Sequence, residues 1–552
     1  MAPWRRMAVA GALALGLYQT ATSVAAIQGP VRTDAGLLQG TPAADPSITV
    51  FRGIPYAAPP VGALRWRPPQ PVMPWTGVRD AGKQAAVCPT GRARPGQTQS
   101  EDCLFVNLWT GASKAGEKRA VMVWFHGSGD NIADAVFDGE NLAKKGVVVV
   151  TVEYRVGVLA GLATRELSQE SGHDASSNYG LMDDVAALQW VRRNIAAFGG
   201  DPANVTLFGQ SHGAGTQHFL AMSPLAMGLF HRVIMQSHAR YPQDPVLFQV
   251  ALDYKTLPEA EAAGARFMDK LGAHSLSELR AAPLEKLLST PTDGGDHVLD
   301  GWFIPHNFAE TYAKGSQVDA FVIAGFNQDE TGASPETNYA RVAERNAARA
   351  AAAAAAAVAE AAGGADRSHQ NPTNPSGLAA YVAAAHQKYG AMSDEYLKLY
   401  PASNDHEAFT ANNDATRDNG RVSLWMWAGA WRQKATQPVY LYYWTHAPPG
   451  KNHDFSGAYH GSEISFVFDH PRGPDELGWT DADRRIGGLM SSYWTNFAKT
   501  GNPNGKGLPT WPAYGGKTQE VMELGDHFRP LTLADKAKVD FWKRFYATQP
   551  AG

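Results

Sequence analysis

The chain has 552 residues, of which 44% are hydrophobic and 18% are charged, and its formal net charge is −4. These values allow a large apolar core, but they exclude a basic surface for nucleic acid and an acidic block that would form a solvated tail. The 15 tryptophans and 35 prolines favour a loop-rich enzyme with aromatic-lined cavities over a helical scaffold.

The first 26 residues have the features of a secretory signal peptide. Arg5 and Arg6 supply the positive start, residues 7–18 form a short apolar stretch, and the small residues at 23–26 offer a cleavage site. The apolar stretch is too short to span a bilayer comfortably. We therefore expect a mature protein that is secreted or periplasmic and has no membrane anchor after signal cleavage.

Two cysteines, Cys88 and Cys103, lie 15 positions apart in a polar loop that also contains glycine, proline and arginine. In an oxidising compartment they should pair, and a disulfide that closes a loop of this size contributes about 3 kcal/mol. Two free thiols are the alternative. Neither cysteine has a histidine beside it in the sequence, which argues against a catalytic thiol.

Strand patterns alternate with helical patterns along the first half of the chain, which predicts an α/β protein with a doubly wound, mostly parallel sheet and helices on both faces. Short, largely apolar runs typical of buried parallel strands occur at 121–125, 147–152, 205–208, 321–324 and 439–443. Apolar residues at helical spacing predict a helix over 181–195.

A loop rich in glycine follows the predicted strand at 121–125. The N–H groups of Ser128 and Gly129, together with the backbone N–H of His212 further along the chain, are the candidate donors of an oxyanion hole. His126 at the start of this loop is expected to be a structural hydrogen-bonding group beneath it and not a proton carrier.

Ser211 lies in a Gly-x-Ser-x-Gly frame that directly follows the predicted strand at 205–208 and precedes a helix-compatible run. Such a strand–turn–helix forces the serine into a strained backbone conformation and projects its Oγ from the top of a sheet. Glycine is needed at 209 and 213 because a Cβ there would collide with a neighbouring strand or helix. The pattern also arises by chance, so other residues must supply the rest of the chemistry.

A serine hydroxyl becomes a useful nucleophile when a base removes its proton and a third group orients that base. In elbow-type enzymes the chain order is serine, acid, histidine. Asp329 and Glu330 both follow the strand at 321–324, so both are candidates for the acid. His460, in a glycine-flanked loop downstream of the strand at 439–443, is the candidate base.

Residues 346–377 break the globular pattern. They contain an unbroken alanine run at 350–357 and end in glycines and a turn rich in proline and asparagine. Alanine is the best helix former, so we expect an exposed helix with a flexible end. We interpret the segment as a surface insertion, and a mobile lid near the mouth of the active site is the alternative.

Together, several blocks of the sequence resemble the type B carboxylesterases, a family that includes bacterial para-nitrobenzyl esterases, mammalian liver carboxylesterases and cholinesterases. The similar blocks are Phe51-Arg-Gly-Ile-Pro-Tyr-Ala57, Glu101-Asp-Cys-Leu-Phe-Val-Asn-Leu108, and residues 178–181, 198–202, 228–232 and 498–503. The resemblance covers the mature chain. It implies one α/β-hydrolase domain over 27–552, with large loop and helical insertions around the active-site cleft, and a disulfide between Cys88 and Cys103.

The same resemblance implies roles for individual residues. Ser211 would be the nucleophile, Glu330 the acid, and His460 the general base, and Ser237 would supply a hydroxyl near this triad. The family has no cofactor or metal in its reaction, so none is expected here. The expected function is hydrolysis of small-molecule carboxylic esters through an acyl-enzyme intermediate.

Some positions depart from the family pattern. Gln210 and His212 replace the glutamate and alanine that usually flank the serine, and Ser128 stands in a loop that is usually glycine-rich. Loss of the carboxylate makes a cationic, choline-like ester a less suitable substrate. His212 and His238 are extra imidazoles, which we interpret as hydrogen-bonded groups in the pocket wall. A partly cationic pocket for anionic or hydroxylated substrates is the alternative, and their spacing does not support a metal site.

Two other functions stay open from the sequence. The same groups could act on amides, carbamates or lactones, or the chain could be a cholinesterase-like binding protein with weak or no catalysis. The intact set of Ser211, Glu330 and His460 argues against the binding protein. The sequence does not indicate the natural substrate or the oligomeric state.

Overall fold

The computed structural model describes residues 26–550 apart from 28, 91–93, 246–253, 294–296, 345–376, 452 and 473–477. The predicted leader, except for Ala26, and nearly all of the alanine-rich segment 346–377 lie outside these described residues. No helix in the part of the chain that is described combines the length and apolar character needed to cross a membrane.

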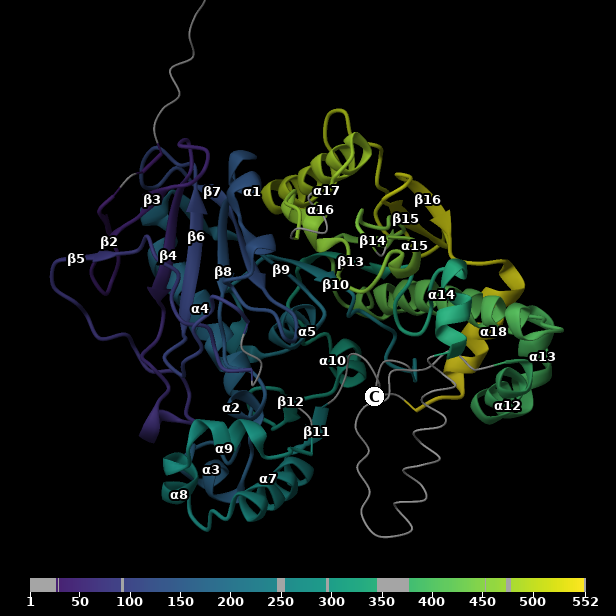
Figure 1. The fold of residues 1–552 in the computed structure, drawn as a ribbon, viewed down its shortest axis with the longest axis horizontal. Coiled ribbons are helices and arrows are strands. Elements are labelled where there is room, and N and C mark those ends of the chain that lie inside the picture. Colours follow the sequence, from purple (N-terminus) through teal and green to yellow (C-terminus); the bar gives the residue numbers. More distant parts are fainter. Residues whose placement is uncertain are drawn as a thin grey trace, which may run out of the picture.

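The centre of the fold is an 11-stranded sheet that runs through the whole molecule (Figure 1). In spatial order its strands are β16 (Arg529–Thr532), β15 (Glu520–Leu524), β14 (Val439–Trp444), β13 (Phe321–Asn327), β10 (Arg232–Gln236), β9 (Gly200–Gln210), β7 (Arg119–Phe125), β8 (Val148–Val152), β6 (Phe105–Thr110), β4 (Thr49–Pro55) and β3 (Thr41–Pro42). The strands from β15 to β8 pair in parallel, and the pairs at both edges are antiparallel.

Two smaller sheets accompany the central one. They consist of β1 (Val31–Arg32), β2 (Leu37–Gln39) and β5 (Val78–Asp80), and of β11 (Tyr254–Thr256) and β12 (His297–Leu299). The α-helices are α1 (Glu140–Lys144), α2 (Val158–Gly161), α3 (Arg165–Glu170), α4 (Tyr179–Asn194), α5 (His212–Leu220), α7 (Leu257–Leu271), α8 (Leu276–Ala281), α9 (Leu284–Ser289), α10 (Phe308–Lys314), α12 (Leu378–Tyr389), α13 (Ser393–Leu399), α14 (Asp405–Trp431), α15 (His453–Ser456), α16 (Ile464–Phe468), α17 (Asp481–Thr500) and α18 (Lys536–Ala547).

Helices cover both faces of the central sheet, as the alternating side chains of β7 show. Val123 and Phe125 pack into the core that contains α4, α5 and α14, whereas Met122 and Trp124 pack into the core that contains α1, α16 and α17. Successive strand residues point to opposite faces, so a strand covered on both faces must be apolar throughout. This explains the continuous apolar run at 121–125 and confirms the predicted doubly wound, mostly parallel sheet.

Four of the five observed strands are longer than the apolar runs that predicted them, whereas β8 (Val148–Val152) is one residue shorter than the run at 147–152. β9 extends over Gly200–Gln210 instead of 205–208, and β13 extends over Phe321–Asn327 instead of 321–324. Polar residues at the strand ends still pair with neighbouring strands, because ladder hydrogen bonds use the backbone and not the side chains. The helix predicted at 181–195 is α4, shifted by one or two residues.

Beyond the sheet, a helical layer occupies the side of the molecule that carries the C-terminal elements. Helix α14, with 27 residues, packs against α12 and α18, and these helices lie together to the right in Figure 1. At the other end of the sheet, Cys88 and Cys103 form a disulfide, in agreement with the expected pairing, and their side chains are buried.

Candidate active site

Ser211 lies between the end of β9 and the start of α5, in a backbone conformation with φ 57° and ψ −123°. Residues other than glycine rarely adopt positive φ because the Cβ then crowds the backbone. The turn is held in place by the Ser211 N–H, which donates to the carbonyl oxygen of Gln236 at the end of β10 over 2.9 Å. The sequence therefore produces the strained turn that the Gly-x-Ser-x-Gly frame predicts.

The two glycines of this frame lie directly against β7. A Cβ at Gly213 would be 2.0 Å from the carbonyl oxygen of Phe125, and a Cβ at Gly209 would be 2.6 Å from the same atom. Such distances are well inside van der Waals contact, so neither position accommodates a side chain. This is the steric requirement that the sequence predicted for the turn.

Glu330 and His460 meet at the same edge of the sheet. Glu330 follows β13, His460 lies in the loop between α15 and α16, and the Nδ1–H of His460 donates to Glu330 Oε2. The other carboxylate oxygen accepts the Asn327 N–H at 2.8 Å. The Glu330 side chain is 2% exposed and that of His460 is 42% exposed, so the carboxylate is enclosed while the imidazole faces outward.

The pKa values of both groups are shifted by this contact. Burial lowers the pKa of His460, but the charge and hydrogen bond of Glu330 outweigh burial and hold that pKa above its usual value. Burial raises the pKa of Glu330, but the His460 charge and hydrogen bond outweigh burial and hold it below its usual value. The pair is thus arranged to stabilise an imidazolium that forms at His460.

Asp329, the other candidate acid, has a different set of partners. One of its carboxylate oxygens pairs with the Arg417 guanidinium at 2.7 Å, and the other accepts the Ala458 N–H at 2.9 Å. An isolated bridge between Asp329 and Tyr459 also joins the two loops. Asp329 therefore fixes the loop that carries His460, whereas Glu330 contacts the imidazole of His460.

The remaining ring nitrogen of His460 contacts Gln210, which the sequence did not predict. The Gln210 Nε2 and His460 Nε2 atoms are 3.1 Å apart, and the Gln210 side chain is buried. Within the described residues, no hydrogen bond joins His460 to the hydroxyl of Ser211. The proton-accepting nitrogen of the candidate base is therefore occupied by the residue directly before the candidate nucleophile.

The loop proposed to form the oxyanion hole follows β7 and lies against the turn at Ser211. A Cβ at Gly127 would be 3.2 Å from the Gln210 carbonyl oxygen and 3.5 Å from Ser211 Cβ. Ser128 and Gly129 are exposed, and their N–H groups donate to no protein acceptor among the described residues. His212, the third expected donor, is the first residue of α5 and adjoins Ser211.

His126 is buried beneath this loop, as the sequence predicted. Its Nδ1 lies 3.0 Å from the Gly127 carbonyl oxygen, its own carbonyl accepts the Tyr154 hydroxyl at 2.6 Å, and its ring stacks on that of Tyr154. Burial lowers the pKa of His126, which keeps the ring neutral. The Arg94 guanidinium also binds the Gly129 carbonyl and Asp134, so the loop is held from both sides.

Ser237 and His238 follow β10, the strand next to β9. Ser237 has φ 62° and donates its N–H to the Gly325 carbonyl at 2.7 Å, while its buried hydroxyl has no hydrogen-bond partner among the described residues. His238 Nδ1 lies 3.3 Å from Nδ1 of His218. The structure places both residues beside the strand that carries Ser211.

The histidines around this strand form a buried wall. The ring of His212 stacks against Tyr154 and against His297. Burial, followed by the charges of His212 and His238, lowers the pKa of His297 well below its usual value, and burial with the charge of His238 does the same for His218. These two imidazoles are neutral near pH 7, which favours a hydrogen-bonding wall over a cationic pocket.

A buried polar network beneath the pair of Glu330 and His460 was missed by the sequence reasoning. Asn327 Nδ2 donates to Glu463 at 2.6 Å and to the Tyr459 carbonyl at 2.7 Å, and Gln236 Nε2 donates to Glu463 at 3.0 Å. Burial raises the pKa of Glu463. A signal was present in the sequence, because Asn327 and Gln236 are polar residues at the ends of otherwise apolar strands.

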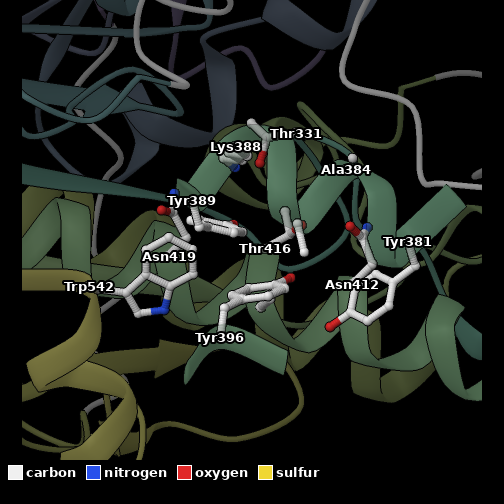
Figure 2. A pocket seen from close by; sticks show the side chains of 13 residues that line it. Thr331, Tyr381, Ala384, Lys388, Tyr389, Tyr396, Asn412, Thr416, Asn419 and Trp542 are labelled. Carbon is white, nitrogen blue, oxygen red and sulfur yellow. The ribbon is translucent and has the colours of Figure 1, made fainter. Parts of the chain in front are cut away.

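A cavity of about 90 Å³ lies in the helical layer, between α12, α14 and α18 (Figure 2). Tyr389, Tyr396 and Trp542 form much of its wall, and Thr331 lies at its border. None of the candidate triad lines this cavity, although Thr331 directly follows Glu330. The described residues contain no group of histidine, cysteine and acidic side chains suited to a metal ion.

Comparisons with known proteins identify the family and the fold of the chain. The model of the carboxylesterase family matches residues 27–542. A fumonisin B1 esterase from Sphingopyxis macrogoltabida is 32% identical over 89% of this chain and 86% of its own, and a human cocaine esterase is 30% identical over 93% and 91%. A solved PNB esterase has a TM-score of 0.70 and 28% identity, covering 93% of this chain and 99% of its own.

The chain therefore belongs to the carboxylesterase family, and its sheet and helices form an α/β-hydrolase fold. It is a carboxylic ester hydrolase, and the family implies small-molecule esters as substrates. A medium-chain fatty acyl-CoA hydrolase precursor from Anas platyrhynchos is also similar, with 32% identity over 95% of this chain and 93% of its own.

Proposed function

We propose that the protein hydrolyses carboxylic esters through an acyl-enzyme intermediate, with Ser211 as nucleophile, His460 as general base and Glu330 as the acid that orients it. The observation that carries the proposal is the strained turn at Ser211, on the same edge of the sheet as the hydrogen bond between Glu330 and His460. The three residues follow β9, β13 and β14 in the chain order typical of this fold.

In the acylation step, Ser211 Oγ attacks the ester carbonyl carbon and its proton passes to His460 Nε2. The imidazolium then donates this proton to the departing alcohol as the carbon–oxygen bond breaks. Water repeats the sequence on the acyl-enzyme and releases the carboxylic acid. Glu330 holds the proton on Nδ1 of His460, so that Nε2 carries the lone pair in the resting enzyme.

The negative charge that develops on the carbonyl oxygen needs donors that are already in place. We assign this role to the N–H groups of Ser128, Gly129 and His212. Support comes from the position of the loop against Ser211 and from the exposed N–H groups of Ser128 and Gly129. One such donor contributes on the order of a hundredfold to a thousandfold in kcat.

Several features of the chain bear on the substrate and on the compartment. With Gln210 in place of a carboxylate, the site lacks the negative charge that would attract a cationic ester, so we propose neutral or hydroxylated esters over choline esters. We further propose that residues 1–26 direct export and that residues 27–552 form one domain. The disulfide supports export, because such bonds persist in oxidising compartments.

The test is the initial rate of hydrolysis of p-nitrophenyl acetate and butyrate by the mature protein, with Ser211→Ala measured beside it. Turnover by the wild type and at least a thousandfold lower rate in Ser211→Ala are expected, because oxyanion donors and binding alone leave little catalysis. Equal rates in the two proteins would contradict the proposal. His460 must be neutral to accept the proton, so kcat/KM should fall as the pH decreases through its raised pKa.

A further inference from the structure

The environment of His460 Nε2 differs from that expected for a base poised beside its nucleophile. This nitrogen lies 3.1 Å from the side-chain nitrogen of Gln210, and the described residues contain no hydrogen bond between His460 and Ser211 Oγ. Gln210 and His460 are 250 positions apart in the chain. The contact is thus a product of the tertiary fold, at the atom on which the proposed reaction depends.

The protonation state of the imidazole fixes the direction of this hydrogen bond. His460 Nδ1 carries a hydrogen because it donates to Glu330, and a neutral imidazole then has a bare lone pair on Nε2. The group that faces this lone pair must be a donor. The amide N–H of Gln210 therefore donates to His460, and the amide oxygen faces the other way.

The amide oxygen of Gln210 lies against the loop of the oxyanion hole. It is 3.3 Å from the position that a Cβ on Gly127 would occupy, and the amide carbon is 3.5 Å from the equivalent position on Gly461. The Gln210 side chain is therefore enclosed between the candidate oxyanion loop and the loop that carries His460, and it is 3% exposed. This enclosure keeps the amide beside His460 in the resting enzyme.

We propose that Gln210 is a positioning residue for His460: its side-chain N–H holds the imidazole in the neutral form with the proton on Nδ1, and it must release Nε2 before that atom can take the proton of Ser211. This inference rests on the proposed function. Once Nε2 bears a hydrogen, it presents a donor to the Gln210 N–H, so the amide must turn or withdraw during each proton transfer.

The other charged groups near His460 belong to residues that none of the variants below changes. Glu330 contacts Nδ1 from the loop after β13, Glu463 acts from the start of α16, and Arg472 acts from the chain that follows α16. Arg240, after β10, acts on Glu330. A change confined to residue 210 therefore alters the environment of Nε2 and leaves these charges as they are.

The inference is tested by the pH dependence of kcat/KM for p-nitrophenyl acetate in the wild type, Gln210→Met and Gln210→Glu. Methionine has a similar length but no donor, so the neutral imidazole loses a stabilising hydrogen bond and the acid midpoint should rise. Glutamate adds a negative charge beside Nε2, which stabilises the imidazolium, so its midpoint should rise further, by about one pH unit or more. The acid midpoint should therefore increase from the wild type to Gln210→Met and again to Gln210→Glu.

Gln317→Met is the matched control. Gln317 is also a buried glutamine, and its amide donates to the Trp431 carbonyl at 3.0 Å; it precedes the start of β13, whereas Glu330 follows the other end of that strand. The acid midpoint of kcat/KM for Gln317→Met should equal that of the wild type. Thermal unfolding of each variant shows that it is folded, and if Gln210→Met does not fold, Gln210→Glu still decides, because glutamate has the shape of glutamine.

The outcomes separate the two proposals. Ester hydrolysis by the wild type with the same acid midpoint in a folded Gln210→Glu variant would overturn the role of Gln210 and leave the proposed function intact. A midpoint for Gln210→Met at or below that of the wild type would overturn it as well. Absence of hydrolysis by the wild type would instead contradict the proposed function.

Discussion

Ser211 combines two features that a local sequence can encode, a strained turn and the glycines that make room for it. Its φ of 57° lies in a region that costs free energy for any residue with a side chain. The Ser211 N–H donates to the end of β10, and the Phe125 carbonyl fills the space beside Gly213. Neighbouring strands thus hold Ser211 in a backbone conformation that the local sequence alone would not stabilise.

Glu330, the proposed acid, is the residue on which a substitution should be most informative. Replacing Glu330 by glutamine offers an amide N–H to His460 Nδ1, which favours the tautomer with the proton on Nε2, where it cannot accept one from Ser211. We expect kcat to fall by about 10³- to 10⁴-fold with little change in KM. Steady-state kinetics on p-nitrophenyl butyrate measures this.

Asp329→Asn serves as the comparison for that substitution. Asp329 pairs with Arg417 and accepts the Ala458 N–H. Loss of this carboxylate should therefore lower the unfolding temperature, while kcat should change much less than in Glu330→Gln. Both variants are assayed at a temperature where thermal unfolding shows them to be folded. A larger loss of kcat in Asp329→Asn than in Glu330→Gln would show that Asp329, and not Glu330, is the acid.

At the scale of the elements, the contact between β7 and the start of α5 sets the position of Ser211, the proposed nucleophile. The end of β9 and the first turn of α5 pack so closely on β7 that glycine is required at 209 and 213. Helix α17, on the other face of the sheet, contains a glycine at 488 with no atom within 4 Å of the position of a Cβ. The two sites differ in packing and share the same residue type.

This contrast predicts opposite effects for the same substitution. Gly213→Ala places a Cβ 2.0 Å from the Phe125 carbonyl oxygen, so we expect a loss of about 1–3 kcal/mol in the free energy of unfolding, together with loss of hydrolysis. Gly488→Ala should gain about 0.5–1 kcal/mol through helix propensity, with unchanged kcat. Urea unfolding followed by circular dichroism tests both, and a neutral Gly213→Ala would refute the steric argument.

The apolar pattern predicted β7, β8, β9, β13, β14 and α4 to within about five residues, but it did not predict the buried strands β4, β6 and β10, and it missed the polar ends of strands. Hydrophobic periodicity reports which side chains are buried, whereas the strands continue wherever backbone ladders continue. Asn327 and Gln236 occupy two such polar ends and belong to the network beneath His460. Their position could have been suspected from the sequence, but their common partner Glu463 could not.

At the scale of the whole molecule, the disulfide ties the first part of the chain to the site. Cys88 donates its N–H to Glu153 Oε1 at 2.8 Å, and the other oxygen of Glu153 accepts the Ile132 N–H in the loop after the oxyanion segment. Burial raises the pKa of Glu153 to about 8. The same carboxyl thus connects the disulfide with the loop after β7, which carries the proposed oxyanion donors.

The free energy of unfolding of the double variant Cys88→Ser, Cys103→Ser should be about 3 kcal/mol lower than that of the wild type, because the unfolded chain regains the entropy of an open loop. Urea unfolding of the double variant and of the wild type measures the difference. Wild-type protein treated with a reductant is the control and should show the same loss. Equal midpoints for oxidised and reduced wild type would contradict the prediction.

The export of the protein and its division into a leader and one domain over 27–552 stay predictions. The leader and the alanine-rich segment at 346–377 lie outside the described residues, so the interpretation of that segment as a surface insertion or a lid also stays open.

The sequence by itself determined the features that depend on residues close together in the chain: five of the buried strands, the turn at Ser211, and the motifs of the carboxylesterase family. The tertiary structure decided which groups meet across the sheet. Glu330, and not Asp329, contacts His460 from 130 positions away, and Gln210 occupies Nε2 from 250 positions away. Local patterns record periodicity and steric limits within a few residues, whereas these contacts depend on how parallel strands bring their carboxyl ends to one edge.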